Sequence, residues 1–192
     1  AEISDITTSV LDQASALMLS AETAVGDYPV ESVAVMRRLA DAASEHLQAS
    51  RNGGHPDRVG TIPQAIGDAL ALICHDLEIT KIVAITISGY AARIVSAKMP
   101  KQPILAVTND RKAARRFNIL PGTKGIHVDI PFSRDSLQHI PACLELLWRQ
   151  GELVDDDLIL VTAVGYPRSG NRMNLIQTHR VDDLRESLSW SR

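Results

Sequence analysis

Residues 86–90, with the sequence Thr-Ile-Ser-Gly-Tyr, form a segment whose side chains could bind an anion. They follow an apolar run and precede a helical pattern. The N–H groups at a helix start have no partner within the helix, so together with two hydroxyl groups and a glycine they could hold a phosphate. In the alternative interpretation, Ser88 only caps the helix and Gly89 only makes the turn. The sequence leaves both interpretations open.

Residues 165–174, Gly-Tyr-Pro-Arg-Ser-Gly-Asn-Arg-Met-Asn, form a second such segment after a later apolar run. In open α/β sheets, ligands bind outside the carboxyl ends of the strands, so both segments should open on one edge. Arg168 and Arg172 would add positive charge to a phosphate pocket. A nucleotide P-loop is excluded because Asn171 and Arg172 stand where lysine and a hydroxyl residue are required. The candidate phosphate-binding residues are Thr86, Ser88, Gly89, Tyr90, Arg168, Ser169 and Gly170.

Ser20 and Glu22 follow a third apolar run near the start of the chain. The run, residues 16–20, is short and bounded by polar residues, which predicts a strand buried on both faces. If this strand belongs to a barrel, the two side chains could reach an active site at the carboxyl ends of the strands. As an isolated pair, they are explained more simply by turn formation.

Composition and charge exclude several classes of protein. The chain has 192 residues, with 20 Lys and Arg against 23 Asp and Glu and a net charge of -3. This balance argues against binding to nucleic acid or to an anionic membrane, since both need a basic face. No apolar run approaches the roughly 18 residues that span a bilayer, and no secretion signal is evident. We therefore expect a cytoplasmic protein that has neither nucleic acid nor membrane as a partner.

Cysteine, histidine and basic residues add no further catalytic motif. Cys74 and Cys143 lie in helical apolar patterns and are interpreted as reduced core thiols. The histidines are scattered, and neither CxxC nor HExxH occurs, so no metal site is predicted. A cluster of basic residues at helical spacing is interpreted as a solvated helix face or an interface. The cluster comprises Arg111, Lys112, Arg115 and Arg116.

The elements that would position these segments alternate along residues 61–181. Helical patterns separate the strand patterns, and a helix start is marked by Thr61, Pro63 and Gln64. The predicted strands are 81–86, 103–108, 125–130, 158–163 and 175–181, and the helices between them are 89–98, 110–117 and 133–150. This order predicts a three-layer α/β/α fold with a mixed five-stranded sheet. Four strands are expected to be parallel and the last antiparallel, because only a loop precedes it.

The rest of the chain is divided by composition. Residues 1–50 predict a helix, the strand 16–20 and a second helix, and one strand between two helices cannot form its own core. Residues 51–60 are rich in glycine and are interpreted as a linker. Residues 182–192 are interpreted as a weakly patterned tail in which Trp190 could dock.

Three stretches resemble pyruvate kinases, in the order in which that family has them. AEISDITTSVLDQASALMLSAETAVGDYPVESVAVM is similar to the last part of the family's (β/α)8 barrel, and its core is LSAETAVGDYP. KIVAITISGYAARIVSAKMPKQPILAVTND resembles the start of the C-terminal domain, and DDDLILVTAVGYPRSGNRMNLIQTHRV resembles its end. The resemblance implies a barrel remnant at residues 1–50, a linker, and a complete C-terminal domain at residues 61–181.

The resemblance also implies which parts of the catalytic site are missing. Pyruvate kinases transfer a phosphoryl group from phosphoenolpyruvate to ADP with Mg²⁺ and K⁺, in a site built on a complete barrel. The lysine and carboxylates that serve there come from earlier strands, so no catalytic set is complete here and no metal is expected to bind. Ser20 and Glu22 would remain as part of the active-site wall. We therefore expect this chain to be inactive alone.

For the C-terminal domain, the resemblance implies a regulatory role. In the family, sugar phosphates or nucleotides bind at the two loops described above, and the domain contributes to a homotetramer. Ile87, Tyr90 and Ala91 stand where effector-binding members often have hydroxyl residues, which would weaken phosphate binding. Residues 17–19, without neighbouring barrel strands, would need burial against another chain or by repacking. The alternative is a stand-alone module that binds a phosphate ligand and no longer serves a kinase.

Overall fold

The computed structural model describes residues 2–49, 61–133, 136–164 and 173–191. The chain forms two compact units, Ala1–Arg58 and Val59–Arg192, which are described separately below. Within the described ranges, no helix is long and apolar enough to cross a membrane. The candidate linker at residues 51–60 lies outside the described residues.

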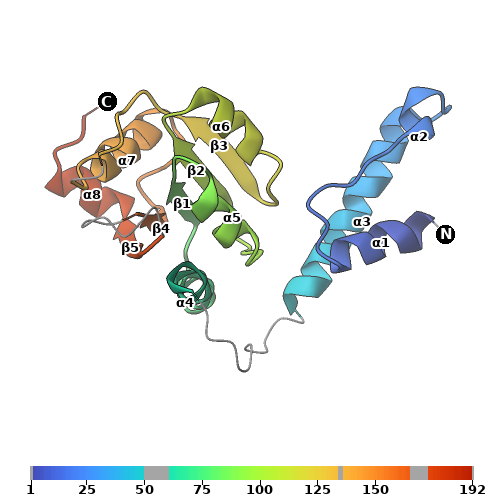
Figure 1. Cartoon of the computed structure of the whole chain (residues 1–192), viewed down its shortest axis with the longest axis horizontal. Helices are drawn as coiled ribbons and strands as arrows, with labels where there is room; N and C mark the ends of the chain where they lie inside the picture. Colours follow the sequence, from blue (N-terminus) through green and yellow to red (C-terminus); the bar gives the residue numbers. More distant parts are fainter. Residues whose placement is uncertain (1, 50–60, 134–135, 165–172, 192) are drawn as a thin grey trace. The chain divides into compact units, whose positions relative to one another are not determined.

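The second unit contains a five-stranded sheet with the order β3-β2-β1-β4-β5 (Figure 1). The strands are β1 (Lys81–Ile85), β2 (Ile104–Thr108), β3 (Thr123–His127), β4 (Leu158–Ala163) and β5 (Leu175–Arg180). The first four strands run parallel to one another, and β5 runs antiparallel to β4. The predicted mixed sheet with four parallel strands and an antiparallel last strand is therefore confirmed.

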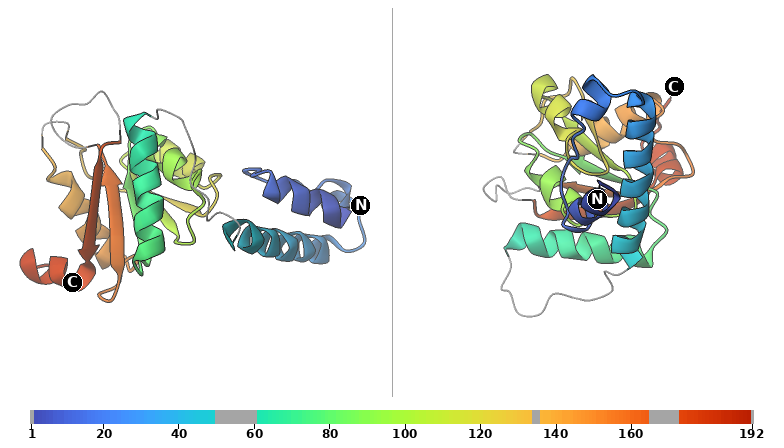
Figure 2. Two further views of the ribbon diagram at one scale, coloured as in Figure 1. Left: turned by 90° about the horizontal axis from the view of Figure 1, so that it is seen from below. Right: turned by 90° about the vertical axis from the view of Figure 1, so that its right-hand side faces the viewer.

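Helices cover both faces of this sheet (Figure 2). They are α4 (Ile62–Asp76), α5 (Tyr90–Ser96) and α6 (Arg111–Phe117) on one face, and α7 (His139–Arg149) and α8 (Val181–Ser187) on the other. Successive strand side chains point to opposite faces. In β1, Val83 packs with the α7 cluster and Ala84 with the α4 and α5 cluster, and both are fully buried. The predicted three-layer architecture is confirmed.

Local sequence signals account for several element ends. α4 begins at the predicted capping box, where the Thr61 N–H donates to Gln64 Oε1 at 2.8 Å. Gly125 lies in the middle of β3, where α6 passes closely over the strand. A Cβ at this position would lie 1.9 Å from the Ala114 carbonyl oxygen. Glycine, which has no Cβ, is therefore the residue that allows α6 to pack on the edge of the sheet.

The predictions for the chain's second half needed three corrections. β3 spans Thr123–His127 rather than 125–130. β5 ends at Arg180, and the predicted tail is a helix, α8, followed by a docked Trp190 that is 8% exposed. α7 begins at His139 rather than Ser133. The sequence signal for α8 was weak because a seven-residue helix depends on its tertiary contacts.

Both cysteines are free thiols in the second unit. Cys143 is fully buried and Cys74 half-buried. Burial raises the pKa of Cys143 to about 12 and that of Cys74 to about 11. The interpretation as free core thiols is confirmed for Cys143, and Cys74 is a free thiol that packs against the edge of the α4 and α5 cluster.

The first unit consists of α1 (Glu2–Leu11), α2 (Ala21–Ala24) and α3 (Pro29–Ala49). α1 packs on α3, burying Val10 and Ala43. The predicted strand at residues 16–20 is wrong, because this segment has no regular secondary structure. A strand needs hydrogen-bonding neighbours, and the described residues of this unit supply none. Met18 is consequently 87% exposed.

Candidate functional site

The candidate phosphate loop, residues 86–89, follows β1 at the centre of the sheet. After β1 the chain passes over one face through α5 to β2, whereas α7 on the other face leads into β4. Strand order therefore reverses between β1 and β4, where α/β proteins commonly bind ligands. β1 and β4 are paired in parallel, with Ala84 beside Thr162, so the loops that follow them begin next to each other.

Thr86 and Gly89 close the turn of this loop. The Gly89 N–H donates to Thr86 Oγ1 at 3.1 Å, and Thr86 is buried. Gly89 has a φ of 80°, and a Cβ there would lie 2.3 Å from Phe117 Cε1, so the position requires glycine. The turn interpretation of Gly89 is confirmed, and the Thr86 hydroxyl is engaged within the loop.

Ser88 does not cap the following helix. Gly89 occupies the N-cap position of α5, which has no side-chain cap. Ser88 is exposed between two partly apolar neighbours, Ile87 (44% exposed) and Tyr90 (37% exposed). A ligand at this loop would therefore meet the Ser88 hydroxyl group, the aliphatic side chain of Ile87 and the phenol of Tyr90.

The neighbouring strand stiffens the same edge, which the sequence analysis missed. Thr108, at the end of β2, is fully buried, and its Oγ1 donates to the Ile87 carbonyl oxygen at 3.4 Å and accepts from the Asp110 N–H at 3.2 Å. Asp110 in turn caps α6, accepting from the Lys112 and Ala113 N–H groups at 2.8 and 3.0 Å. Hydrogen bonds from these two N–H groups lower the pKa of Asp110. The sequence signal that could have revealed these contacts is a threonine at the end of a strand, followed two residues later by an aspartate.

The remaining candidates are placed less fully. Arg168, Ser169 and Gly170 lie outside the described residues. Ser20 and Glu22 form a local turn in the first unit, where the Ser20 N–H donates to Glu22 Oε2 at 2.9 Å. Hydrogen bonds from the Glu22 and Ser20 backbones lower the pKa of Glu22. Among the described residues, no group of three or more His, Cys, Asp and Glu side chains could hold a metal ion.

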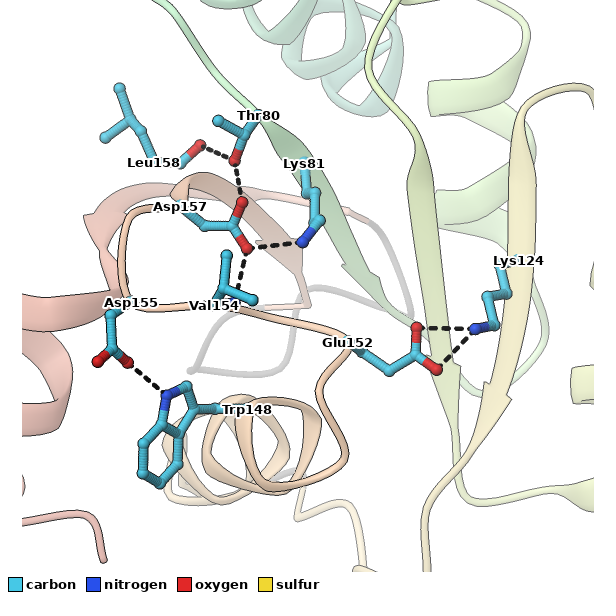
Figure 3. Close-up of polar contacts among 9 residues, drawn as sticks. All are labelled: Thr80, Lys81, Lys124, Trp148, Glu152, Val154, Asp155, Asp157 and Leu158. Atoms are coloured by element: carbon cyan, nitrogen blue, oxygen red, sulfur yellow. Dashed lines mark hydrogen bonds and ion pairs between the residues drawn. The ribbon is translucent and has the colours of Figure 1, made fainter. Parts of the chain in front are cut away.

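A buried carboxylate lies at the amino end of the sheet, opposite the candidate loop (Figure 3). Asp157 Oδ2 accepts from Lys81 Nζ at 2.7 Å and from the Val154 N–H at 2.8 Å, and Oδ1 accepts from Thr80 Oγ1 at 2.7 Å. Burial raises the pKa of Asp157, but these hydrogen bonds outweigh burial and hold it below its ordinary value. The group is structural, because it joins the starts of β1 and β4.

Comparison with protein families decides what this α/β unit is. Residues 64–179, which contain all of the sheet except Arg180, match the family model described as "Pyruvate kinase, alpha/beta domain". The chain belongs to the pyruvate kinase family. Residues 1–33 match "Pyruvate kinase, barrel domain", so the first unit carries barrel sequence. Both parts of the resemblance in the sequence are confirmed.

Individual pyruvate kinases give the same result. "Pyruvate kinase 2" of Synechocystis sp. is 35% identical over 170 residues, covering 85% of this chain and 27% of that protein. The pyruvate kinase of Geobacillus stearothermophilus is 32% identical, covering 96% of this chain and 31% of its own length. A crystal structure of Cryptosporidium parvum pyruvate kinase has a TM-score of 0.67 at 27% identity, covering 94% of this chain and 36% of that one. The chain thus spans about a third of the length of these relatives.

Proposed function

We propose that this chain is the effector-binding and assembly region of a pyruvate kinase, which transfers a phosphoryl group from phosphoenolpyruvate to ADP in glycolysis. The match of residues 64–179 to the family's α/β domain carries this proposal. The loop at residues 86–90 would receive the phosphate of a sugar phosphate or nucleotide effector, with Arg168, Ser169 and Gly170 as its partners. A cytoplasmic location belongs to the same proposal.

The geometry of the loop supports weak rather than tight phosphate binding. Ser88 and the N–H groups of the first turn of α5 offer donors at the strand-order reversal. Thr86 is buried and its Oγ1 accepts from the Gly89 N–H, Ile87 brings no donor, and Tyr90 offers a phenolic hydroxyl in place of a short one. Each hydrogen bond to a charged group contributes about 1.5 to 3 kcal/mol, so the loss of two removes most of the affinity.

The 192-residue chain itself is proposed to lack phosphoryl transfer. The reaction depends on positioned metal ions and cationic side chains that stabilise charge in the transition state. Mg²⁺ and K⁺ are the family's metal ions, and among the described residues no group of three or more His, Cys, Asp and Glu side chains could hold a metal ion. Those cofactors belong to the complete enzyme, and Ser20 and Glu22 would line its site. Pyruvate formation by the purified chain would contradict this proposal.

Assembly is proposed to use the outer side of α4. Two of its apolar residues are exposed, Ile62 at 57% and Leu72 at 61%, and Leu77, just after the helix, is 47% exposed. Burying these side chains against another copy would stabilise a homotetramer through the hydrophobic effect. Met18 of the first unit is also exposed, and association with another copy of the chain would bury it.

A thermal-shift titration tests the effector proposal. A ligand that binds the native state raises the apparent melting temperature. We expect AMP, sugar phosphates or inorganic phosphate to raise Tm for the unmodified chain and for Ser4→Ala, a matched control in the first unit. Ser88→Ala should reduce this response. Equal responses from all three proteins would remove Ser88 from the site, and no response from any would overturn the effector proposal.

A further inference from the structure

The last segment of the chain, Val181–Trp190, is packed into the second unit although it lies beyond the residues matched by the family model. Val181 is fully buried and Trp190 is 8% exposed. The rings of Trp190 and Trp148, the latter on α7, have centroids 6.0 Å apart. We call this segment the C-terminal strap.

The strap is fastened to one turn of the chain, residues 153–157, which connects the end of α7 to β4. The Val181 N–H donates to the Asp157 carbonyl oxygen at 3.0 Å, and the Asp182 N–H donates to the Asp155 carbonyl oxygen at 3.1 Å. The Asp155 carboxylate accepts from Trp148 Nε1 at 2.6 Å and pairs with Arg185 Nη1 at 3.4 Å. Side-chain and backbone contacts therefore fix the strap at the same place.

The opposite side of this turn holds the start of the central strand. Its Asp157 carboxylate accepts from Thr80 and Lys81, at the beginning of β1, and from the Val154 N–H of the turn itself (Figure 3). The turn is thus a shared clamp. One set of its groups binds the strap, and another binds the amino end of β1.

We propose that docking and release of the C-terminal strap control whether the clamp, the turn at residues 153–157, is structurally ordered. α8 has seven residues, and a helix of that length is unstable without tertiary contacts, so folding and docking of the strap form one transition. When docked, the strap braces the turn and fixes the amino end of β1. When released, it loosens that edge and uncovers Trp148. Any binder or protease that captures the undocked segment would bias the transition.

The test is amide hydrogen exchange of the full 192-residue chain in three variants. Trp190→Ala removes the buried anchor, Trp190→Phe retains an aromatic ring, and Leu188→Ala alters an exposed residue of the same strap (46% exposed). Beyond faster exchange within the strap, we expect Trp190→Ala to speed exchange of the Thr80 and Val154 amides by about tenfold or more. Trp190→Phe should largely restore protection, and Leu188→Ala should leave it unchanged. Faster exchange confined to residues 181–191 would overturn the proposal.

A second measurement decides the question if Trp190→Ala fails to fold. In the unmodified chain, exchange is followed as denaturant is raised below the unfolding transition. The proposal requires the Val154 amide to open together with the Trp190 amide, as one unit. Opening of the strap at a lower denaturant concentration, with Val154 still protected, would refute it. Asp155→Asn, which weakens the pairing to Arg185 but keeps an oxygen for Trp148, should lower the opening free energy of both amides equally.

Discussion

Val83 in the second unit and Met18 in the first both lie in strand-like sequence patterns, but their side chains differ in burial. Val83 lies in β1 between two parallel neighbours and is fully buried, whereas Met18 lies in an irregular segment and is 87% exposed. The local patterns are similar, but the second unit contains the neighbouring strands, whereas residues 2–49 of the first unit contain none. A buried-strand pattern therefore indicates that a segment can be buried between neighbouring strands. The neighbouring strands themselves must come from elsewhere in the structure.

The largest expected effect is in the tightly packed second unit. Gly125→Ala would place a Cβ 1.9 Å from the Ala114 carbonyl oxygen, so α6 or β3 must shift. We expect a loss of about 3 kcal/mol or more in the free energy of unfolding, measured by urea unfolding followed by circular dichroism. Gly122→Ala is the control, with φ of 64° but no atom within 4 Å, and should cost about 1 kcal/mol. Equal losses would show that the packing difference has no energetic consequence.

The next effect concerns the buried carboxylate at the amino end of the sheet. Asp157→Asn weakens the bonds to Lys81 and Thr80, and breaking a buried ion pair costs about 3 kcal/mol. Because the pKa of Asp157 is lowered from 3.8 on folding, its ionised form stabilises the protein above that pH. This contribution is lost as pH falls through the folded pKa. The stability gap between the unmodified protein and the variant should therefore narrow in acid. A gap independent of pH would argue against the ionic contribution.

The smallest effect is expected from an ion pair in the first unit. Arg37 and Asp41 on α3 are 3.8 Å apart, with side chains 84% and 71% exposed. Pairs exposed to this degree contribute little because solvent screens them, so Asp41→Asn should change the stability of the unit by no more than about 0.5 kcal/mol. Helix content of α3 against temperature, at low and high salt, measures this. A loss as large as that of Asp157→Asn would erase the contrast between the units.

Sequence reasoning was most successful where signals are local. The capping box at Thr61 and the alternation of strands and helices were predicted, and the turn at Gly89 was one of two interpretations left open; all three depend on short-range steric and hydrogen-bonding preferences. It was less successful where partners are distant. The failed strand at residues 16–20 lacks neighbouring strands, and α8 owes its order to Trp148 and the 153–157 turn.

The candidate site was predictable in position but not in detail. A loop after the first strand of a parallel sheet must open at its carboxyl edge, and the structure places residues 86–89 there. Sequence could not reveal that the Thr86 hydroxyl is used by Gly89, nor that Thr108 braces Ile87. Both contacts join residues brought together by folding rather than by a recognisable motif.

The tilted pair of indoles described above makes the two units spectroscopically unequal. The chain has two tryptophans, Trp148 and Trp190, and both belong to one cluster in the second unit. Intrinsic emission excited at the red edge of indole absorption is therefore insensitive to melting of α1 and α3. An unfolding curve recorded in this way would report one unit while the other had already lost its structure.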